Sequence, residues 1–253
     1  MTRAGVVASK TAIRFSRKDP MTLRLHCAPD NASLCVRLAL EELGLSYDAV
    51  LVDRRVRAQQ APAYLALNPH GMIPVLETPE GPIFETAAIL LWLSDRHRDR
   101  AALMPAPGAP ERGMTLAWLF WLSNTLHPAL RMLFYGGEHI APEMVFALHE
   151  RTAQRTIAML DRLEAAAPGL GGWLGAAQPS ALDCYLAPML RWCALYPESG
   201  TGWFDLGRWP ELRGALDRFE TRASVEAAIR AEGLGSHPFT APRPPQPPEG
   251  SAR

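Results

Sequence analysis

The stretch from Ile73 to Thr86 contains the residues best suited to binding a small ligand. Two short apolar runs, Ile73 to Leu76 and Pro82 to Phe84, flank a turn, which predicts a β-hairpin. Pro74 stands at the front of the first run, although proline cannot donate to a sheet ladder. Either Pro74 occupies an edge or the first residue of a strand, or the Ile73–Pro74 bond is cis. In the second case the backbone N–H and C=O of Ile73 stay unpaired, and an extended peptide can dock there as an additional strand.

Glu85 and Thr86 begin the apolar helix that follows the hairpin. The first backbone N–H groups of a helix are unpaired and carry partial positive charge, so a carboxylate is favoured beside them. Thr86 can donate its hydroxyl and its N–H to that carboxylate, and Glu85 can accept from a neighbouring ammonium. The alternative is an ordinary helix start without a ligand.

The composition restricts the class of protein and its partners. The chain has 253 residues, of which 48% are hydrophobic and 21% charged, with a formal net charge of zero. This is the composition of one large or two small globular domains, and it gives no reason to expect nucleic acid or a membrane surface as partner. No apolar run approaches the roughly 18 residues of a membrane span.

Cysteine usage indicates a reducing compartment. The four cysteines form no Cys-x-x-Cys pair, and no histidines accompany them at zinc-finger spacing. We therefore expect free thiols, a cytoplasmic location and no bound metal.

The predicted elements divide the chain into two domains. From residue 21 to about 98 the order is β-α-β-α-β-β-α, with strands at 23–27 and 46–53, a helix at 33–43, a loosely helical connection at 54–67, the hairpin, and a helix from 85. Beyond Pro107 we find no strand and expect helices at 110–135, 142–165, 180–196, 210–221 and 223–232, the first of them kinked at Pro128. The expected organisation is a disordered lead (1–20), an α/β domain (21–100), a linker (101–109), an all-helical domain (110–235) and an extended Pro-rich tail (236–253).

The motif NPHGMIPVLE, the following ETAAIL and this order of elements resemble the glutathione transferase superfamily. The family pattern is Asn-Pro-x-Gly-x-Val-Pro-x-Leu, with Glu-Ser or Glu-Thr about ten residues later. This chain matches it at Asn68, Pro69, Gly71, Ile73, Pro74, Leu76, Glu85 and Thr86. The likeness covers roughly residues 21–235 and implies a thioredoxin-like first domain, an all-helical second domain, a cis Ile73–Pro74 bond and a homodimer.

A second feature agrees with this resemblance. Ser180 and Asp183 have the spacing of a capping box, in which the serine caps the helix N–H groups and the aspartate reaches back. Such a box opens a buried helix in the second domain of the family, although any helix can carry one.

The resemblance implies a glutathione site. Ile73, before Pro74, would pair with the cysteinyl backbone of glutathione, while Glu85 and Thr86 would bind its γ-glutamyl end. His70 could reach the glycyl carboxylate, or it is a solvated loop histidine. Met72 stands where relatives often have a polar residue, so one contact is missing.

The glutathione thiol must ionise before it can attack, because its ordinary pKa near 8.5 leaves only a few per cent of thiolate at neutral pH. Some relatives have a cysteine where Ala32 falls, so this chain departs from that pattern. Ser33 is our first candidate for the activating donor and Asn31 the second, unless either simply caps the first helix. Cys27 and Cys35 are expected in the core.

Trp118, Trp121, Phe134 and Tyr135 lie on the long helix that in the family lines the pocket for the electrophile. From the residues alone, aromatic side chains at helical spacing are more typical of a core.

These features predict a glutathione transferase that joins the glutathione thiolate to a small hydrophobic electrophile. One alternative is a glutathione-dependent disulfide reductase or peroxidase, which would need two glutathione molecules because Ala32 replaces the cysteine. The other is a non-catalytic binding module, although such a module has no need of Ile73-Pro74 and Glu85-Thr86.

Overall fold

The computed structural model describes residues 22–246. The expected lead over residues 1–20 and the last part of the expected tail, 247–253, lie outside the described residues.

The first domain is built on a four-stranded mixed sheet. Its strands are β1 (Leu23–Cys27), β2 (Tyr47–Leu51), β3 (Val75–Thr78) and β4 (Gly81–Phe84), in the order β2-β1-β3-β4. β1 pairs in parallel with β2 and antiparallel with β3, and β3 and β4 form the predicted antiparallel hairpin. The first domain therefore has the β-α-β-α-β-β-α order of elements expected from the sequence.

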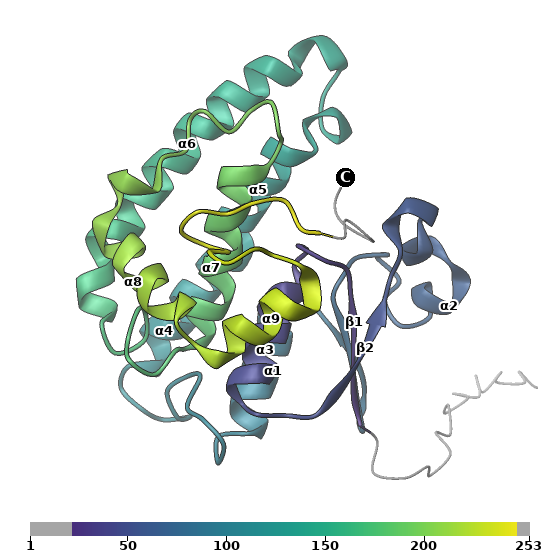
Figure 1. The fold of residues 1–253 in the computed structure, drawn as a ribbon, viewed down its shortest axis with the longest axis vertical. Coiled ribbons are helices and arrows are strands. Elements are labelled where there is room, and N and C mark those ends of the chain that lie inside the picture. The colour runs from purple at the N-terminus through teal and green to yellow at the C-terminus, as the bar shows by residue number, and fades with distance from the viewer. Residues whose placement is uncertain (1–21, 247–253) are drawn as a thin grey trace, which may run out of the picture.

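Helices α1 (Ser33–Glu42) and α3 (Thr86–Arg96) lie between the sheet and the second domain (Figure 1). α1 is buried from Ser33 to Leu40, because one face meets the sheet and the other meets the second domain. Such a helix must be apolar almost all round, as its sequence is. The short helix α2 (Pro62–Leu65) and the 3₁₀ turns Arg54–Val56 and Ala58–Gln60 form the connection between β2 and β3.

Among its described residues, the second domain has helices and connecting loops but no strand. Its α-helices are α4 (Arg112–Trp121), α5 (His127–Phe134), α6 (Val145–Ala166), α7 (Ala181–Leu195), α8 (Pro210–Glu220) and α9 (Ala223–Glu232). α7 runs through the centre of this domain, while α6 lies along its outer side (Figure 1). Among residues 22–246, no helix combines the length and the apolar character that crossing a membrane requires.

Pro128 interrupts the long first helix of this domain through its missing N–H. Because Pro128 cannot bond the carbonyl four residues earlier, the ladder changes register over a five-residue π-helical segment, Leu122–Leu126, in which the His127 N–H bonds the Leu122 carbonyl. The interruption expected at Pro128 is thus a π segment that joins α4 to α5.

The capping box at the start of α7 forms as predicted. The Leu182 N–H donates to the Ser180 hydroxyl at 3.0 Å, and the Ser180 N–H donates to Asp183 Oδ2 at 2.8 Å. Asp183 Oδ1 also accepts from the Gly175 N–H at 2.7 Å. The box therefore fixes both the helix and the loop before it.

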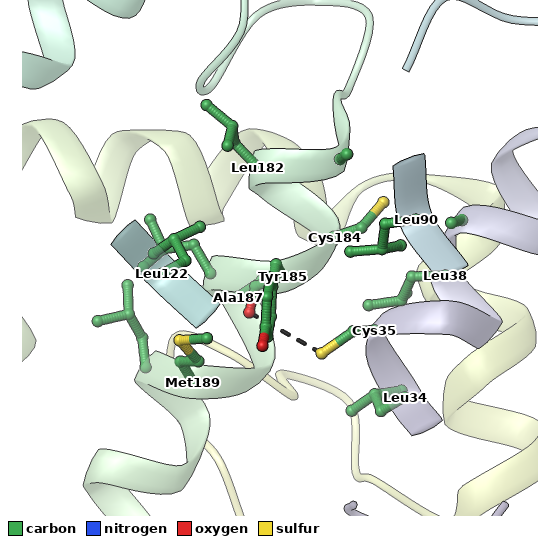
Figure 2. Packing of buried hydrophobic residues seen from close by; sticks show 14 of the residues in the cluster. Leu34, Cys35, Leu38, Leu90, Leu122, Leu182, Cys184, Tyr185, Ala187 and Met189 are labelled. Atoms are coloured by element: carbon green, nitrogen blue, oxygen red, sulfur yellow. Dashed lines mark hydrogen bonds between the residues drawn. The ribbon is translucent and has the colours of Figure 1, made fainter. Parts of the chain in front are cut away.

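All four cysteines are free, as expected, and all four are buried, as expected for Cys27 and Cys35. Cys35 lies between α1 and α7 among leucines, near the Tyr185 carbonyl (Figure 2). Burial raises the pKa of Cys27 to about 11 and raises the pKa of Cys35, Cys184 and Cys193 as well. Thiols of this kind are poor nucleophiles at neutral pH.

The segment after α9 has no helix or strand up to residue 246, but it is packed against the second domain. Phe239 is only 1% exposed and stacks on Phe219 with ring centroids 5.8 Å apart. The Gln246 N–H bonds the Gly233 carbonyl at 2.9 Å. The described part of the expected tail is therefore part of the folded domain.

Candidate functional site

A cavity of about 1040 Å³ lies between the two domains. The start of α1, the β3 edge and the start of α3 line it from the first domain, and α5 and the end of α7 line it from the second. The wall includes Asn31, Ala32, Arg54, Arg57, Gln59, Gln60, Ile73, Pro74, Glu85, Thr86, His127, Arg131, Phe134, Tyr135, Tyr185 and Tyr196.

Ile73 presents an unpaired backbone edge to this cavity. β3 begins only at Val75, which pairs with His26 and Phe84. The Ile73–Pro74 bond is cis, and neither the N–H nor the C=O of Ile73 has a hydrogen-bond partner among residues 22–246. The preceding Met72 carbonyl is held by the Tyr64 hydroxyl at 2.8 Å and the Asn68 amide at 2.9 Å. The edge is thus fixed in position and open to a ligand backbone.

The start of α3 faces the same cavity. The first bond of this helix runs from the Ile89 N–H to the Glu85 carbonyl, so the N–H groups of residues 86–88 have no acceptor within the helix. Glu85 precedes the helix with φ at +71°, a conformation that L-residues rarely adopt, and its side chain makes no capping bond. Since both residues line the cavity, the Glu85 carboxylate and Thr86 are available to a ligand.

At the start of α1, the structure separates the two expected thiol activators. Asn31 and Ala32 line the cavity. Ser33 is fully buried, and its hydroxyl donates to the Ala28 carbonyl at 3.0 Å and accepts from the Ala28 N–H at 3.2 Å. Because Ser33 does not reach the cavity and both of its bonds hold the loop, the geometry speaks against our first candidate and leaves Asn31.

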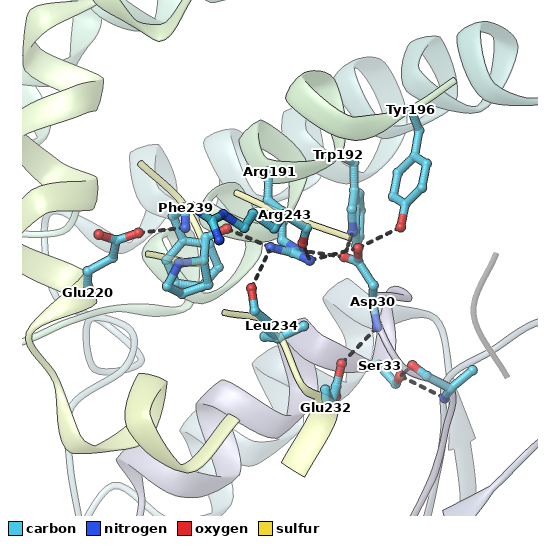
Figure 3. Close-up of polar contacts among 12 residues, drawn as sticks. Asp30, Ser33, Arg191, Trp192, Tyr196, Glu220, Glu232, Leu234, Phe239 and Arg243 are labelled. Atoms are coloured by element: carbon cyan, nitrogen blue, oxygen red, sulfur yellow. Dashed lines mark hydrogen bonds and ion pairs between the residues drawn. The ribbon is translucent and has the colours of Figure 1, made fainter. Parts of the chain in front are cut away.

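Asp30, directly before Asn31, is the centre of a buried polar network that the sequence did not reveal (Figure 3). Its carboxylate accepts from Arg191 at 2.8 and 3.0 Å, from the Trp192 indole at 2.9 Å and from the Tyr196 hydroxyl at 2.7 Å. Its N–H donates to Glu232 at 2.9 Å, and its φ is +52°. The loop that carries Asn31 is therefore held by α7 and α9 of the other domain.

His70 does not line the cavity. It is exposed, its ring packs edge-on against Phe84 with centroids 5.7 Å apart, and its N–H bonds the Asn68 side chain at 3.0 Å. From the connection between β2 and β3, Arg57, Gln59 and Gln60 line the cavity instead. The expected contact of His70 with the ligand thus has no support in the structure, and the polar run RRVRAQQ (54–60) is the part of the sequence that contains these three wall residues.

Trp118 and Trp121 do not line the cavity either. Their rings pack against each other with centroids 5.1 Å apart, and both pack on the main hydrophobic core. The positions on this helix that reach the wall include Ser123, His127 and Arg131, each four residues after the last. Of the expected electrophile pocket, only Phe134 and Tyr135 line the cavity.

Tyr135 lies between two arginines at the cavity wall. The Arg54 guanidinium nitrogens are 3.4 Å from its hydroxyl, and the Arg131 guanidinium lies over its ring, 5.2 Å from the centroid. This part of the cavity wall therefore combines an aromatic ring with two guanidinium groups.

His127, which the sequence analysis did not single out, also belongs to the wall. Its Nδ1 is 3.0 Å from the Tyr185 hydroxyl, and its ring packs between Tyr185 and Trp192. Burial and the charge of Arg131 lower the pKa of His127 to about 4, so the imidazole is neutral at physiological pH.

Comparison with known proteins agrees with this geometry. Residues 32–96 match the family model for the glutathione S-transferase N-terminal domain, and residues 146–218 match that for the C-terminal domain. A maleylacetoacetate isomerase of Pseudomonas aeruginosa is 31% identical over 216 residues, which cover 83% of this chain and 94% of the relative. The chain belongs to the glutathione transferase superfamily.

Other members of the superfamily are similar over most of their length. Glutathione S-transferase GST-4.5 of Xanthomonas campestris is 27% identical over 84% of this chain and all of its own, and the disulfide-bond oxidoreductase YfcG of Escherichia coli is 28% identical over 83% and 96%. Among solved structures, a sphingomonad glutathione S-transferase complexed with glutathione is 31% identical, with a TM-score of 0.70 over 84% of this chain and all of that one.

A glutathione transferase from Burkholderia graminis has two glutathione molecules bound per subunit. It is 26% identical and aligns with a TM-score of 0.72 over 85% of this chain and 90% of its own. The thioredoxin-like first domain and helical second domain predicted for this chain are confirmed by these superfamily members.

Proposed function

We propose that this protein binds glutathione in the cavity between its domains and joins the glutathione thiolate to a small hydrophobic electrophile. The observation that carries the proposal is the convergence of three open backbone features on one cavity: the unpaired Ile73 edge, the start of α3 at Glu85 and Thr86, and the start of α1 at Asn31. Glutathione presents a peptide backbone, a charged amino-acid end and a thiol, and each of these groups suits one of the three features.

In the proposed complex, glutathione lies along the β3 edge. Its cysteinyl N–H and C=O pair with Ile73, its γ-glutamyl carboxylate accepts from Thr86, and its ammonium donates to Glu85. Arg57, Gln59 and Gln60 are the groups at hand for the glycyl carboxylate, in place of His70.

The thiol end then lies at the start of α1. The Asn31 amide and the partial positive charge of the helix start stabilise the thiolate relative to the thiol. No protein thiol takes part in this scheme, since burial holds all four cysteines in their neutral form.

The test is binding and turnover in a matched pair of threonine variants. Thr86→Val removes the proposed carboxylate donor, whereas Thr115→Val removes a buried hydroxyl on α4 whose one partner among residues 22–246 is the Glu111 carbonyl. We expect glutathione to bind about tenfold or more weakly in Thr86→Val, because a hydrogen bond to a charged group contributes about 1.5–3 kcal/mol. Thr115→Val keeps its affinity and its activity with chlorodinitrobenzene. A wild type that is not retained on immobilised glutathione would refute the proposal.

A second candidate function is glutathione-dependent disulfide reduction. The observation in its favour is the cavity volume of about 1040 Å³, which lies at the upper end for ligand sites and leaves room for a second small molecule beside glutathione. One glutathione thiolate attacks the substrate disulfide and expels a thiolate. A second glutathione thiolate then attacks the mixed disulfide, so that glutathione disulfide and two substrate thiols result. Turnover of hydroxyethyl disulfide with none of chlorodinitrobenzene would favour this reaction over conjugation.

We also propose a cytoplasmic homodimer with a role in detoxification. Four free thiols are typical of proteins in a reducing compartment. The dimer is an expectation from the superfamily. Light scattering of the purified protein measures the dimer directly.

A further inference from the structure

Two arginines from different domains meet at one tyrosine in the cavity wall. Tyr135 follows α5 directly, and its N–H bonds the carbonyl of Arg131 one turn earlier. Arg54 belongs to the connection between β2 and β3 of the first domain, and both of its terminal nitrogens lie 3.4 Å from the Tyr135 hydroxyl. All three residues line the cavity, so a ligand there can contact both guanidinium groups.

The Arg54 guanidinium is not neutralised by a carboxylate. The acidic residue beside it in the chain, Asp53, is paired with Arg55 at 2.7 Å. Among residues 22–246 Arg54 has no ion-pair partner, and its contacts with the Tyr135 hydroxyl are long for hydrogen bonds. The planar fork of a guanidinium matches the two oxygens of a carboxylate. Arg54 therefore has donors available to an anionic ligand.

Arg131 is only weakly neutralised. Its guanidinium lies over the Tyr135 ring, 5.2 Å from the centroid, and 3.9 Å from the Glu138 carboxylate. The side chain of Glu138 is 64% exposed, and an exposed pair of this kind contributes little free energy. A ligand carboxylate can therefore displace Glu138 from Arg131.

The other charged residues of the wall have partners or an assigned role. Asp30 is paired with Arg191, and Glu198 has an interaction partner of its own. In the proposed glutathione complex, Glu85 binds the ammonium and Arg57 is at hand for the glycyl carboxylate. The guanidinium groups of residues 54 and 131 thus remain without a part in binding glutathione.

These guanidinium groups lie at some distance from the proposed thiolate. At the start of α5, His127 packs against Trp192, whose indole N–H donates to Asp30 next to Asn31. Tyr135 lies about 12 Å further along the helix axis, at about 1.5 Å per residue. This distance leaves room for one aromatic ring between the thiolate and the guanidinium groups.

Aromatic side chains line this part of the cavity. The ring of Phe134 packs edge-on against Tyr135 and Tyr196, with centroids 6.4 and 6.1 Å away. Aromatic rings bury much apolar area and favour edge-on or offset contacts with a further ring. The ligand that suits the whole wall therefore combines an aromatic ring with a carboxylate.

We propose that Arg54 and Arg131 determine specificity by binding the carboxylate of an aromatic electrophile. This inference rests on the proposed function and names the class of its acceptor. The glutathione sulfur forms a bond to the ring carbon opposite the carboxylate, and an electron pair moves into the ring and its electron-withdrawing substituents. That pair returns as a halide leaves with the electrons of its own bond, while the thiol proton has gone to solvent. The arginines orient the ring and take no part in the bonds that change.

The experiment compares 4-chloro-3,5-dinitrobenzoate with its methyl ester, which has the same reacting carbon but no charge. In Arg54→Met and in Arg131→Met we expect kcat/KM for the acid to fall about tenfold, the lower end of the effect of one hydrogen bond to a charged group. Conjugation of the ester and the affinity for glutathione stay as in the wild type. The control is Arg208→Met, whose guanidinium also lies 5.2 Å from a ring centroid, that of Trp209, but outside the cavity wall. It changes neither reaction.

Glu138→Gln tests the sign of the charge effect. This variant removes the carboxylate that competes for Arg131, so kcat/KM for the acid rises about twofold while the ester is unaffected. A value for the acid that stays the same or falls would mean that Arg131 does not bind the acceptor carboxylate.

Each other outcome counts against the inference. Equal losses with the acid and the ester in Arg54→Met would mean that the guanidinium only supports the wall, and no loss with the acid would mean that it binds no acceptor. A lower glutathione affinity in this variant, or the loss of a second bound glutathione in calorimetry, would assign Arg54 to a glutathione carboxylate. A wild type that conjugates the ester but not the acid refutes the inference and leaves the proposed function standing. A wild type that binds no glutathione refutes the proposed function itself.

Discussion

The residues at the start of α1 show how neighbouring side chains divide two tasks. Ser33 ties the loop to the Ala28 backbone from inside the core, while Asn31 lines the cavity. Both residue types are good helix caps and good hydrogen-bond partners for a thiolate, so type alone does not separate them. What separates them is that Asn31 lines the cavity and Ser33 does not.

We expect Asn31→Ala and Ser33→Ala to act on different quantities. Asn31→Ala raises the pKa of the bound glutathione thiol and lowers the turnover of chlorodinitrobenzene, because the proposed thiolate loses a donor. Ser33→Ala lowers the free energy of unfolding by about 1–3 kcal/mol, because it leaves buried Ala28 groups unpaired. The ultraviolet absorbance of the thiolate against pH and urea unfolding measure the two effects. A higher thiol pKa in Ser33→Ala alone would restore Ser33 as the activator.

The depressed pKa of His127 predicts a loss of stability in acid. In the unfolded chain the imidazole titrates near 6.5, and in the folded protein near 4, where Arg131 of α5 and the hydroxyl of Tyr185 on α7 face it. Between these values the unfolded state binds the extra proton, so stability is complete above 6.5 and falls as the pH drops toward 4. The loss from this group is about 3 kcal/mol. Urea unfolding of the wild type and of His127→Gln over this range should show that difference, and parallel curves would contradict it.

At the scale of the elements, the sequence predicts those features that depend on residues close together in the chain. The strands, the hairpin and the box of Ser180 and Asp183 follow from residues a few positions apart. Trp118 and Trp121, which the resemblance placed in the pocket and the residues alone favoured in the core, pack against each other and on the core. Pro128 accounts for the π segment Leu122–Leu126, but which of the later side chains reach the cavity depends on how the helix packs against the rest of the fold.

The capping box permits a comparison of two buried serines. Ser180→Ala removes a hydroxyl that accepts from the Leu182 N–H, and we expect it to lower the free energy of unfolding by about 0.5–2 kcal/mol. Ser94→Ala removes a hydroxyl on α3 that is equally buried but has no partner among residues 22–246. Its effect should be close to zero or stabilising, because an unpaired buried hydroxyl is itself unfavourable. Equal losses in urea unfolding would show that the box contributes nothing beyond packing.

At the scale of the whole molecule, the cavity depends on contacts between distant parts of the chain. Arg191 on α7 binds Asp30, which lies 161 residues away, and donates also to the carbonyls of Pro238 and Arg243 beyond α9. Glu232 binds both the Asp30 N–H and Arg37. No local pattern predicts such pairs, which is why the sequence identified the loop at Asn31 but not what holds it.

Arg191 is therefore expected to be a residue on which both domains depend. Arg191→Met leaves the buried carboxylate of Asp30 without its cation, and breaking a buried pair in this way costs about 3–5 kcal/mol. Arg230→Met breaks an exposed pair with Glu226 on α9 and should change the free energy of unfolding by less than about 1 kcal/mol. In Arg191→Met combined with Asp30→Asn, the total loss should be clearly smaller than the sum of the single losses, because the unpaired charge is gone. Urea unfolding of the four variants measures this coupling, and strictly additive losses would mean that Arg191 acts through the segment after α9 alone, independently of the loop that carries Asn31.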